Sequence, residues 1–233
     1  MENQTFTALI SIQEEAGYFF PGRHFVSIGH NQLYRIMIEK LENNRQIDRI
    51  VINTDSAMIR NAYGRLPKFK VINAYVAEPG EIEMELTSDK VTTAMLEHAE
   101  GEHFVQLGAI FPFLKASTIE STLDTYYKQV TDAEDPGRSF DSVLTIRTLN
   151  RRMFDSDNDL VREDRPNTFV EDGILHVFNR TTFKANGNRK VGKKPFGCGV
   201  DEIENMAIDS EENYLLAEFV DKTRHRFRNV FGR

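Results

Sequence analysis

The loop that follows the first apolar run of the chain combines residues that could bind phosphate. It runs from Gln13 to His24 and closes on Arg23 and His24, a cation beside an imidazole. In an α/β protein this loop cradles phosphates with backbone N–H groups, and Arg23 would neutralise them. Glu14 and Glu15 oppose that use, because carboxylates repel an anion. The alternative is an ordinary connection in which three aromatic residues pack on the sheet: Tyr18, Phe19 and Phe20.

Three later groups offer further polar chemistry. Asp55 follows a second apolar run and could orient a ligand or cap the next helix. Lys193 and Lys194 stand beside glycine and proline, where two flexible ammonium groups could neutralise phosphates or simply be solvated in a turn. Asp209 offers a hard oxygen ligand suited to Mg²⁺, although acidic residues at a helix start also favour the helix dipole. Spacing alone favours the structural interpretation at all three positions.

Other catalytic patterns are missing from the sequence. The histidines show no paired metal-ligand spacing, and the single cysteine, Cys198, has no partner at a zinc-like interval. A GxSxG elbow, a P-loop and a GxGxxG fingerprint are absent as well, which disfavours a hydrolase, a P-loop NTPase and a dinucleotide enzyme. We therefore predict no zinc site.

Composition bounds the class of protein. The 233 residues, 40% hydrophobic and 28% charged, are typical of a folded protein, and we expect one domain over 1–233. A formal charge of −7 argues against nucleic-acid binding. Basic residues nevertheless gather at the C-terminus, as a solvated helix end or as an arm that binds a partner or phosphate. The apolar runs are too short to cross a membrane, and no export signal is visible. With one cysteine, the expected location is the cytoplasm.

The elements that must position these residues alternate between strand and helix in the first half of the chain. Apolar and β-branched runs predict strands at 5–12, 50–52, 70–74 and 103–110. Apolar residues at helical spacing predict helices around 33–41, 55–62, 89–99 and 119–130, with Thr54 or Asp55 capping the second and Asp89 the third. This alternation is typical of a mainly parallel, Rossmann-like α/β sheet flanked by helices, with ligands beyond the carboxyl ends of the strands.

The second half of the chain changes character. Ser142–Thr148 and Asp172–Arg180 are predicted strands separated by a polar stretch, so we expect a β excursion at about 140–185. The segment from Gly187 to Gly197 is rich in turn formers, and a helix from Glu211 to Lys222 closes the fold. Three apolar strand residues would pack on a partner surface or on the chain's own core: Ile174, Leu175 and Val177.

Residues that follow parallel strands meet at one edge of the sheet and define the expected pocket. Its boundaries are Ile10 to His24, Thr54-Asp55, Thr87 to Asp89, Gln106 and Asp209. Six residues are expected to contact a nucleotide there: Ile10, Ser11, Gln13, His24, Asp55 and Ser88.

Segments in the same order over nearly the whole chain resemble the acylneuraminate cytidylyltransferase family. They are Ala8-Leu-Ile, Pro21-Gly-Arg, Ile50 to Ser56, Gly101 to Gln106, Pro112 to Lys115, Gly187-Asn-Arg with Gly192-Lys-Lys-Pro195, and Ala207 to Glu218. The family joins CTP to sialic-acid-like or related sugars and releases pyrophosphate. The resemblance therefore implies a homodimeric, Mg²⁺-dependent α/β enzyme. It further implies that Arg23, Lys193 and Lys194 act on the triphosphate, that Gln106 and Lys115 contact an acidic sugar, and that Asp209 holds the metal.

The sequence departs from the family where charge matters most. Gln13 stands at the position of an arginine, and Glu14 and Glu15 replace glycines of the phosphate loop. Ala207 replaces the first of two metal-binding aspartates, which leaves Asp209. Two hypotheses result: a divergent cytidylyltransferase that transfers CMP from CTP to an acidic sugar, or a non-catalytic relative that serves as a binding or assembly protein. A nucleotidyltransferase with another nucleotide or acceptor is a third.

Overall fold

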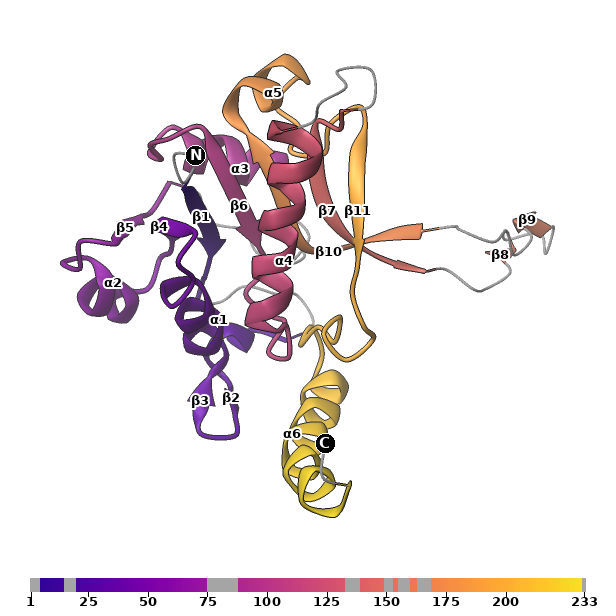
Figure 1. Ribbon diagram of the computed structural model, residues 1–233. Coiled ribbons are helices and arrows are strands. Elements are labelled where there is room, and N and C mark those ends of the chain that lie inside the picture. Colours follow the sequence, from indigo (N-terminus) through magenta and orange to yellow (C-terminus); the bar gives the residue numbers. More distant parts are fainter. Residues whose placement is uncertain are drawn as a thin grey trace.

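The computed structural model (Figure 1) describes residues 5–14, 20–74, 88–132, 139–148, 153–154, 160–162 and 169–231. Within these residues a seven-stranded sheet carries helices on both faces. From one edge to the other its strands are β11 (Pro195–Gly199), β7 (Ser142–Thr148), β10 (Phe169–Asn179), β6 (His103–Leu107), β1 (Phe6–Ser11), β4 (Ile47–Asn53) and β5 (Phe69–Ile72).

The strand directions confirm the predicted fold class. β1 runs parallel to β4 and β6, and β4 runs parallel to β5. β11 is parallel to β7, whereas β10 is antiparallel to both of its neighbours, β6 and β7. From β1 the chain moves outward through β4 to β5 and then crosses to β6 on the other side of β1. A topological switch point, the place where α/β sheets bind ligands, therefore lies between β1 and β6.

Alternation along the strands divides the apolar residues between two layers. Ala8 and Ile10 of β1 pack with α1 (Leu33–Glu42) and α4 (Ala116–Tyr126) in the larger core cluster. Leu9 points to the opposite face, where α3 (Asp89–Leu96) and α5 (Arg180–Ala185) cover the sheet through Met95 and Phe183. Figure 1 shows α1 and α4 in front of the sheet and α3 behind it. Because successive side chains of a strand point to opposite faces, the one sheet contributes to two apolar cores.

Serines cap two of the helices that begin at the carboxyl edge of the sheet. The hydroxyl of Ser56 accepts the N–H of Ile59 at the start of α2 (Ala57–Tyr63), and the hydroxyl of Ser88 accepts the N–H of Val91 in α3. The prediction that Thr54, Asp55 or Asp89 would be the caps was wrong by one or two residues. Because the cap is supplied by a hydroxyl, the Asp55 and Asp89 carboxylates make other contacts.

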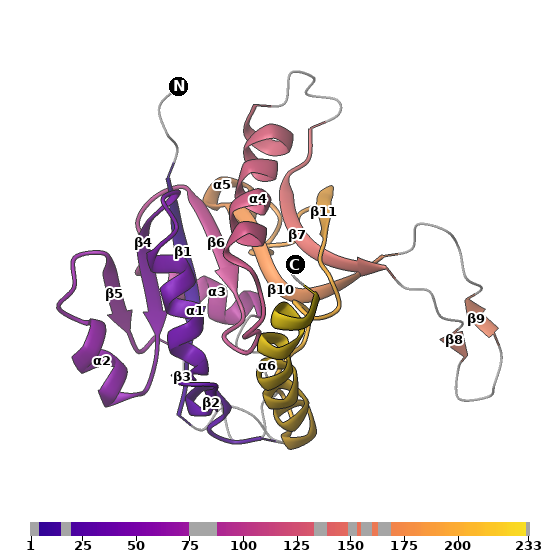
Figure 2. The same ribbon diagram turned by 60° about the horizontal axis from the view of Figure 1, so that its bottom comes forward.

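The predicted β excursion is mostly part of the main sheet. β7 and β10 lie between β6 and β11, and only the short pair β8 (Met153–Phe154) and β9 (Leu160–Arg162) stands apart from the body, as Figure 2 shows. Ile174, Leu175 and Val177 are fully buried in the core of their own chain. The expectation that these three residues need a partner surface was therefore wrong, because the insertion of β10 beside β6 covers them.

Three of the remaining elements lie around the carboxyl edge of the sheet: a short 3-10 helix at Arg23–Phe25, the hairpin of β2 (Ser27–Ile28) and β3 (Asn31–Gln32), and the terminal helix α6 (Glu211–Phe231). A π-helical turn at Tyr127–Thr131 follows α4 at the amino edge, where the ring of Tyr127 packs on Phe6 at the start of β1. α6 is longer than predicted and projects from the body beside the β2–β3 hairpin. In the described part of the chain, no helix is long and apolar enough to span a membrane.

Candidate functional site

The loops that follow β1 and β4 lie side by side at the carboxyl edge, next to the switch point, and are joined by hydrogen bonds. At the ends of the two strands the side chain of Asn53 donates to the hydroxyl of Ser11 at 2.9 Å, and its oxygen accepts the N–H of Ala74 at 3.0 Å. Two residues further on, the Asp55 carboxylate accepts the backbone N–H of Glu14 at 2.9 Å. Asn53 is fully buried, so its amide fixes the spacing of the three strands β1, β4 and β5 at this edge.

The first loop turns back on itself through a buried histidine. The ring Nδ1 of His24 lies 3.0 Å from the backbone nitrogen of Gln13 and 3.1 Å from its carbonyl oxygen. Gln13, Arg23 and His24 are all buried. Gly22 precedes the 3-10 helix with φ of 75°, a conformation that glycine adopts without strain. The end of the loop is therefore fixed in place, and it holds Arg23 at the carboxyl edge.

A second group of polar side chains lies on the face of the sheet that α3 covers. The hydroxyl of Thr92 donates to the side-chain oxygen of Gln106 at 2.6 Å, and both residues are buried. His176 is the partner of Gln106 in the register between β10 and β6. Its Nε2 donates to the Glu171 carboxylate at 2.5 Å. Polar groups from α3, β6 and β10 thus converge next to the switch point.

Lys190 brings a buried cation to this polar group. Its backbone N–H and its ammonium both contact the Asp89 carboxylate, at 3.0 and 3.5 Å. Burial lowers the pKa of Lys190, and the nearby Asp89 and Glu171 carboxylates oppose that shift. Because Lys190 is only 8% exposed, its charge is poorly screened by solvent. A buried cation beside the carboxyl edge is suited to binding an anion.

The Glu171–His176 pair is held by a bulge in β10. The register between β10 and β7 shifts between Glu171 and His176, and Gly173 within the bulge has φ of 73°. Burial lowers the pKa of His176, whereas the hydrogen bond from His176 lowers the pKa of Glu171. The pair therefore consists of a neutral imidazole that donates to a carboxylate. Glu171 is half-exposed and places this negative charge at the rim of the site.

The bulge also buries a carboxylate. Asp172 accepts the hydroxyl of Thr145 at 2.5 Å and the N–H of Ile174 at 3.1 Å through one oxygen, Oδ1. Its other oxygen has no hydrogen-bond partner among the residues that the structure describes. Burial raises the pKa of Asp172. These contacts join the first half of β10 to β7 and support the position of Glu171 beside Asp172.

The structure brings together most of the residues predicted to bind a nucleotide. Ser11, Gln13, His24 and Asp55 lie at the ends of β1 and β4, as predicted from strand order. Ser88 begins α3, and its carbonyl accepts the hydroxyl of the Thr92 that contacts Gln106. Ile10 is an exception, because its side chain is fully buried in the core formed with α1 and α4. Thr87 and Glu15 to Phe19 lie outside the described residues.

The exposed side chain of Lys115 is paired with two carboxylates. Its ammonium contacts Asp201 at 2.6 Å and Glu204 at 2.7 Å, while the second oxygen of Glu204 accepts the N–H of Lys115 at the start of α4. These contacts raise the pKa of Lys115. The placement does not support the role in sugar binding that the resemblance implied, because the lysine joins the loop after β11 to α4.

Lys193 and Lys194 lie at the other end of the sheet. They precede β11, whose first residue Pro195 pairs with the first residue of β7. Their backbone N–H groups donate to the Asp141 carboxylate, and the ammonium of Lys194 lies 5.4 Å from the centre of the Phe140 ring. Because parallel strands start at the amino edge, this position is remote from Arg23. The structure does not bring these lysines together with Arg23.

Asp209 lies on the same edge of the sheet as Arg23. The preceding residue, Ile208, donates its N–H to the carbonyl of Ile110 in the loop after β6. The rings of Tyr214 in α6 and Phe20 in the first loop are 5.9 Å apart, which places the start of α6 beside that loop. The Asp209 carboxylate is exposed and accepts a hydrogen bond from the side chain of Asn213 at 2.6 Å.

The side chains present offer Mg²⁺ a partial set of ligands. Among the described residues, no group of three or more histidine, cysteine, aspartate or glutamate side chains is arranged to hold a metal. Mg²⁺ often binds through one or two carboxylates together with substrate phosphates and waters. The exposed Asp209 carboxylate therefore fits an ion that arrives with a triphosphate, and it does not fit a metal held by the protein alone.

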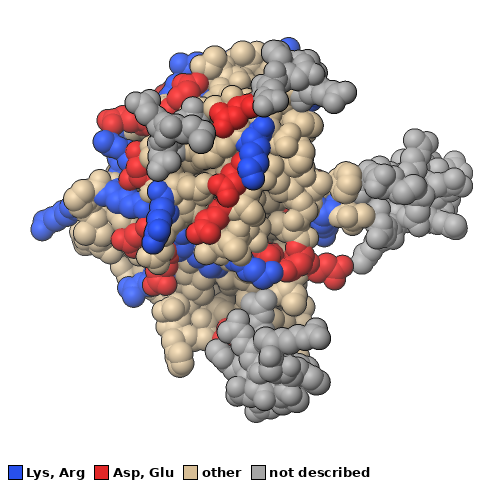
Figure 3. Space-filling model, viewed as in Figure 1, with Lys and Arg blue, Asp and Glu red and all other residues tan. Residues whose placement is uncertain are grey.

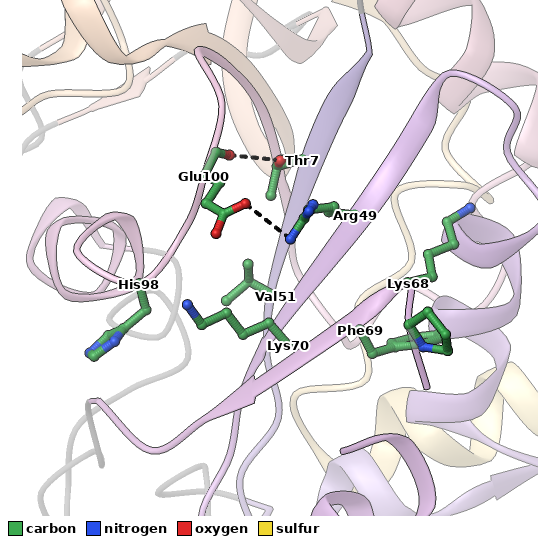
Figure 4. A pocket seen from close by; sticks show the side chains of 9 residues that line it. Thr7, Arg49, Val51, Lys68, Phe69, Lys70, His98 and Glu100 are labelled. Atoms are coloured by element: carbon green, nitrogen blue, oxygen red, sulfur yellow. Dashed lines mark hydrogen bonds and ion pairs between the residues drawn. The ribbon is translucent and has the colours of Figure 1, made fainter. Parts of the chain in front are cut away.

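A small hollow lies away from this site, beside the start of β1 (Figure 4). Arg49 pairs with Glu100 at 3.1 Å across it, and Thr7 donates to the carbonyl of Glu100. Lys70 and His98 line the other side. The hollow encloses about 20 Å³, room for about one water molecule. It is too small for a nucleotide.

On the face drawn in Figure 3, acidic and basic side chains alternate without a continuous basic surface.

Sequence reasoning missed several polar residues of the candidate site. Asn53 at the end of β4 and Thr92, Glu171 and Lys190 on the α3 face were not predicted as site residues, and His176 was considered only as a zinc ligand. A signal existed for His176, since it is a polar residue inside the apolar run from Ile174 to Phe178. Its contact with Glu171 depends on the bulge, which local sequence does not reveal.

Three solved structures that share this fold are cytidylyltransferases. The 4-diphosphocytidyl-2C-methyl-D-erythritol synthase of Anaerococcus prevotii matches with TM-score 0.70 and 13% identity, covering 95% of this chain and 100% of that chain. A CMP:2-keto-3-deoxy-manno-octonic acid synthetase complexed with CTP matches with TM-score 0.61 and 10% identity, covering 95% and 99%. A further 4-diphosphocytidyl-2C-methyl-D-erythritol synthase matches with TM-score 0.65 and 12% identity, covering 93% and 99%.

These likenesses define the class of fold. The chain has the mainly parallel α/β fold of cytidylyltransferase-type nucleotidyltransferases. At 10% to 13% identity the likeness establishes the fold alone. No protein-family model and no curated protein matches the chain. The acylneuraminate branch and an acidic sugar acceptor therefore stay predictions.

Proposed function

We propose that this protein is a cytidylyltransferase that transfers CMP from CTP to an acidic sugar and releases pyrophosphate. The observation that carries the proposal is the convergence of two polar groups at the switch point of a cytidylyltransferase-type sheet. One group, at the ends of β1 and β4, contains Gln13, His24 and Asp55. The other, on the α3 face, contains Gln106 and Lys190. Their positions suit a nucleotide and an acceptor lying side by side.

The reaction requires positioning and charge neutralisation more than covalent chemistry by the protein. An acceptor hydroxyl oxygen forms a bond to the α-phosphorus of CTP, the bond from that phosphorus to the bridging oxygen breaks, and pyrophosphate leaves with the electron pair. The hydroxyl proton is released to solvent. Arg23 at the end of the first loop would stabilise negative charge on the departing phosphates. Lys190 would bind the carboxylate of the acceptor, and Gln106 would orient its hydroxyl groups.

Magnesium is the expected cofactor of the reaction. When bound, Mg²⁺ neutralises phosphate charge and polarises the phosphoryl oxygens. Asp209 is the carboxylate that would hold it, because Asp209 is exposed and lies on the same edge as the first loop. Asn213, which donates to Asp209, would keep that carboxylate oriented.

A non-catalytic binding protein is the second candidate, and one observation favours it. The loop after β6, where an acceptor would be expected to find polar partners, is apolar and buried. Its buried side chains are Ala109, Ile110, Phe111, Phe113 and Leu114. This loop packs on the core and contacts the segment before α6, so it contributes stability rather than recognition.

Calorimetric titration of CTP into the protein, with and without Mg²⁺, tests the nucleotide site directly. We expect binding that Mg²⁺ strengthens, whereas GTP and ATP bind more weakly. Pyrophosphate release is then measured with a panel of acceptors that contains 2-keto-3-deoxy sugar acids and neutral sugars. Release with the acids alone supports the full proposal. CTP binding without release for any acceptor supports the non-catalytic candidate, and absence of CTP binding rejects the enzyme and also favours that candidate, as a binding or assembly protein.

A further inference from the structure

Two basic side chains near the small hollow at the start of β1 have structural partners. Arg180 donates to three backbone carbonyls at and after the end of α3, at distances of 2.8 to 3.1 Å. Lys68 donates to three carbonyls at and after the end of α1, of which that of Glu42 is nearest, at 2.6 Å. Cations at the C-terminal end of a helix complement the helix dipole. The fold therefore accounts for these two side chains.

Three other basic side chains meet around the hollow itself. Arg49 comes from β4, Lys70 from β5 and His98 from the segment after α3. Val51, the partner of Lys70 in the strand register, follows Arg49 by two positions. Arg49 and Lys70 therefore lie on the same face of neighbouring strands. Figure 4 shows the Lys70 ammonium directed toward His98, whereas Lys68 points away from the hollow.

The positive charge of this group is only partly compensated. The Nη1 of Arg49 lies 3.1 Å from the Glu100 carboxylate, and both side chains are more than half exposed, so the pair contributes little to stability. Among the described residues, the side chains of Lys70 and His98 have no hydrogen bond or ion pair. Like charges on neighbouring strands repel each other. In a chain with a formal charge of −7, two basic groups without a carboxylate partner call for a ligand as their explanation.

The shape and chemistry of the hollow suit a phosphate group. Its floor is closed by Thr7 and Val51, which are 4% and 2% exposed, and the hydroxyl of Thr7 already donates to the carbonyl of Glu100 at 3.0 Å. The remaining polar groups are donors: a guanidinium, an ammonium and an imidazole N–H. They require a compact ligand with several acceptor oxygens, and a guanidinium matches phosphate oxygens in pairs. With about 20 Å³, the hollow admits part of such a group and leaves the rest of a larger ligand outside.

We propose that Arg49, Lys70 and His98 form an anion site that binds a phosphate group, carried by free phosphate or by a phosphate ester. Arg49 and Lys70 supply the charge, and the His98 ring supplies a further donor at the rim. The Glu100 carboxylate opposes the anion, so the affinity is limited and depends on salt. The site lies beside the start of β1, at the opposite end of the sheet from the candidate nucleotide site.

Titration of inorganic phosphate into isotope-labelled protein, with ionic strength held constant by chloride, tests the proposal. We expect the backbone NMR signals of the residues around the hollow to shift and to saturate. Arg49→Gln and Lys70→Gln should each weaken binding about tenfold, because a charge-assisted hydrogen bond is lost, whereas Lys70→Arg should retain it. Arg45→Gln and Lys128→Gln are the matched controls, since both side chains are exposed and neither lines the hollow. Thermal unfolding confirms that each variant folds.

A sugar monophosphate, titrated in the same way, identifies the source of the phosphate group. Binding at least as tight as that of free phosphate assigns the site to esters, and weaker binding assigns it to free phosphate. Shifts that do not saturate would overturn the proposal, as would binding that is unchanged in Arg49→Gln and Lys70→Gln or equally weakened in the control variants. The affinity for CTP should be the same in Arg49→Gln as in wild type. The outcome is therefore separate from that of the proposed transfer reaction.

Discussion

The Asp55 carboxylate accepts the backbone N–H of Glu14 at 2.9 Å and so joins the loop after β4 to the loop after β1. Asp55→Ala removes this bond and lets the first loop open, whereas Asp55→Asn keeps an acceptor oxygen and removes only the charge. We expect Asp55→Ala to bind CTP about three- to tenfold more weakly than Asp55→Asn, since a neutral hydrogen bond contributes about 0.5–1.5 kcal/mol. Calorimetry of the two variants measures the difference. Equal affinities would mean that the bond does not shape the nucleotide site.

Glu14 is expected to repel the nucleotide that the first loop binds. Its side chain is exposed beside the loop, so Glu14→Gln removes a negative charge without loss of core packing. CTP affinity should rise several-fold at about 20 mM salt and show little change near 0.5 M salt, because solvent ions screen exposed charges. Glu120→Gln, on the exposed side of α4, is the control. An increase that persists at high salt would contradict the electrostatic explanation.

Much of the fold could be predicted from local sequence, because apolar residues recur with a different period in strands and in helices. The strand Ser142–Thr148 was predicted with its observed bounds, and the first strand differs from β1 by one residue at each end. β11 was missed, since a proline and two glycines in five residues are typical of a turn. The structure explains Gly197: a Cβ there would lie 2.4 Å from the end of the Ile146 side chain. That close approach depends on the pairing of β11 with β7.

The candidate site was predicted only where it follows from strand order. Gln13, His24 and Asp55 come after the first two parallel strands, so their convergence needed no long-range information. The place of His176 was beyond local sequence, because it requires an antiparallel strand to enter between β6 and β7. Lys193 was expected in place of Lys190. Both belong to one basic segment, and the sequence alone does not tell which of its lysines is buried.

Substitution of Lys190 is expected to weaken binding of the acceptor, whereas the same substitution of Lys193 is not. If the enzyme uses an acidic acceptor, Lys190→Met should raise the KM for that acceptor about tenfold, because a charge-assisted contact of about 1.4 kcal/mol is lost. The affinity for CTP should change less than twofold. Lys193→Met should leave both constants unchanged, since Lys193 lies at the amino edge of the sheet. Steady-state pyrophosphate release measures the two constants, and Lys190→Arg should restore part of the loss.

Equal effects of Lys190→Met and Lys193→Met would refute the assignment of the acceptor side to Lys190. A general loss of folding would also confuse the comparison, so the unfolding temperature of each variant is measured beside its kinetics. The neighbouring Asp89 is partly exposed, and water can solvate its carboxylate once the lysine is gone. We therefore expect Lys190→Met to lower stability only slightly.

The buried pair of His176 and Glu171 makes stability depend on pH. Burial lowers the pKa of His176 in the folded protein, and Lys190 lowers it further, whereas Glu171 and Asp172 oppose the shift. In the unfolded chain the imidazole titrates near its ordinary pKa of about 6.5. Below that pH the unfolded state binds a proton that the folded state resists, so the free energy of unfolding falls as the pH is lowered. The pKa of Glu171 is also lowered, which adds acid sensitivity below about pH 4.5.

Urea unfolding between about pH 5 and 8 should show this slope and its origin. In His176→Gln, residue 176 cannot take up a proton, so the free energy of unfolding should fall less steeply with decreasing pH below about 6.5. The slopes of wild type and variant should differ by at most about 1.36 kcal/mol per pH unit, the contribution of one proton. Some slope will persist, because burial also lowers the pKa of His103. His98→Gln is the matched control: His98 is exposed, and its loss should leave the slope unchanged. If His176→Gln and wild type lose stability with the same slope, His176 is not the buried neutral imidazole that positions Glu171.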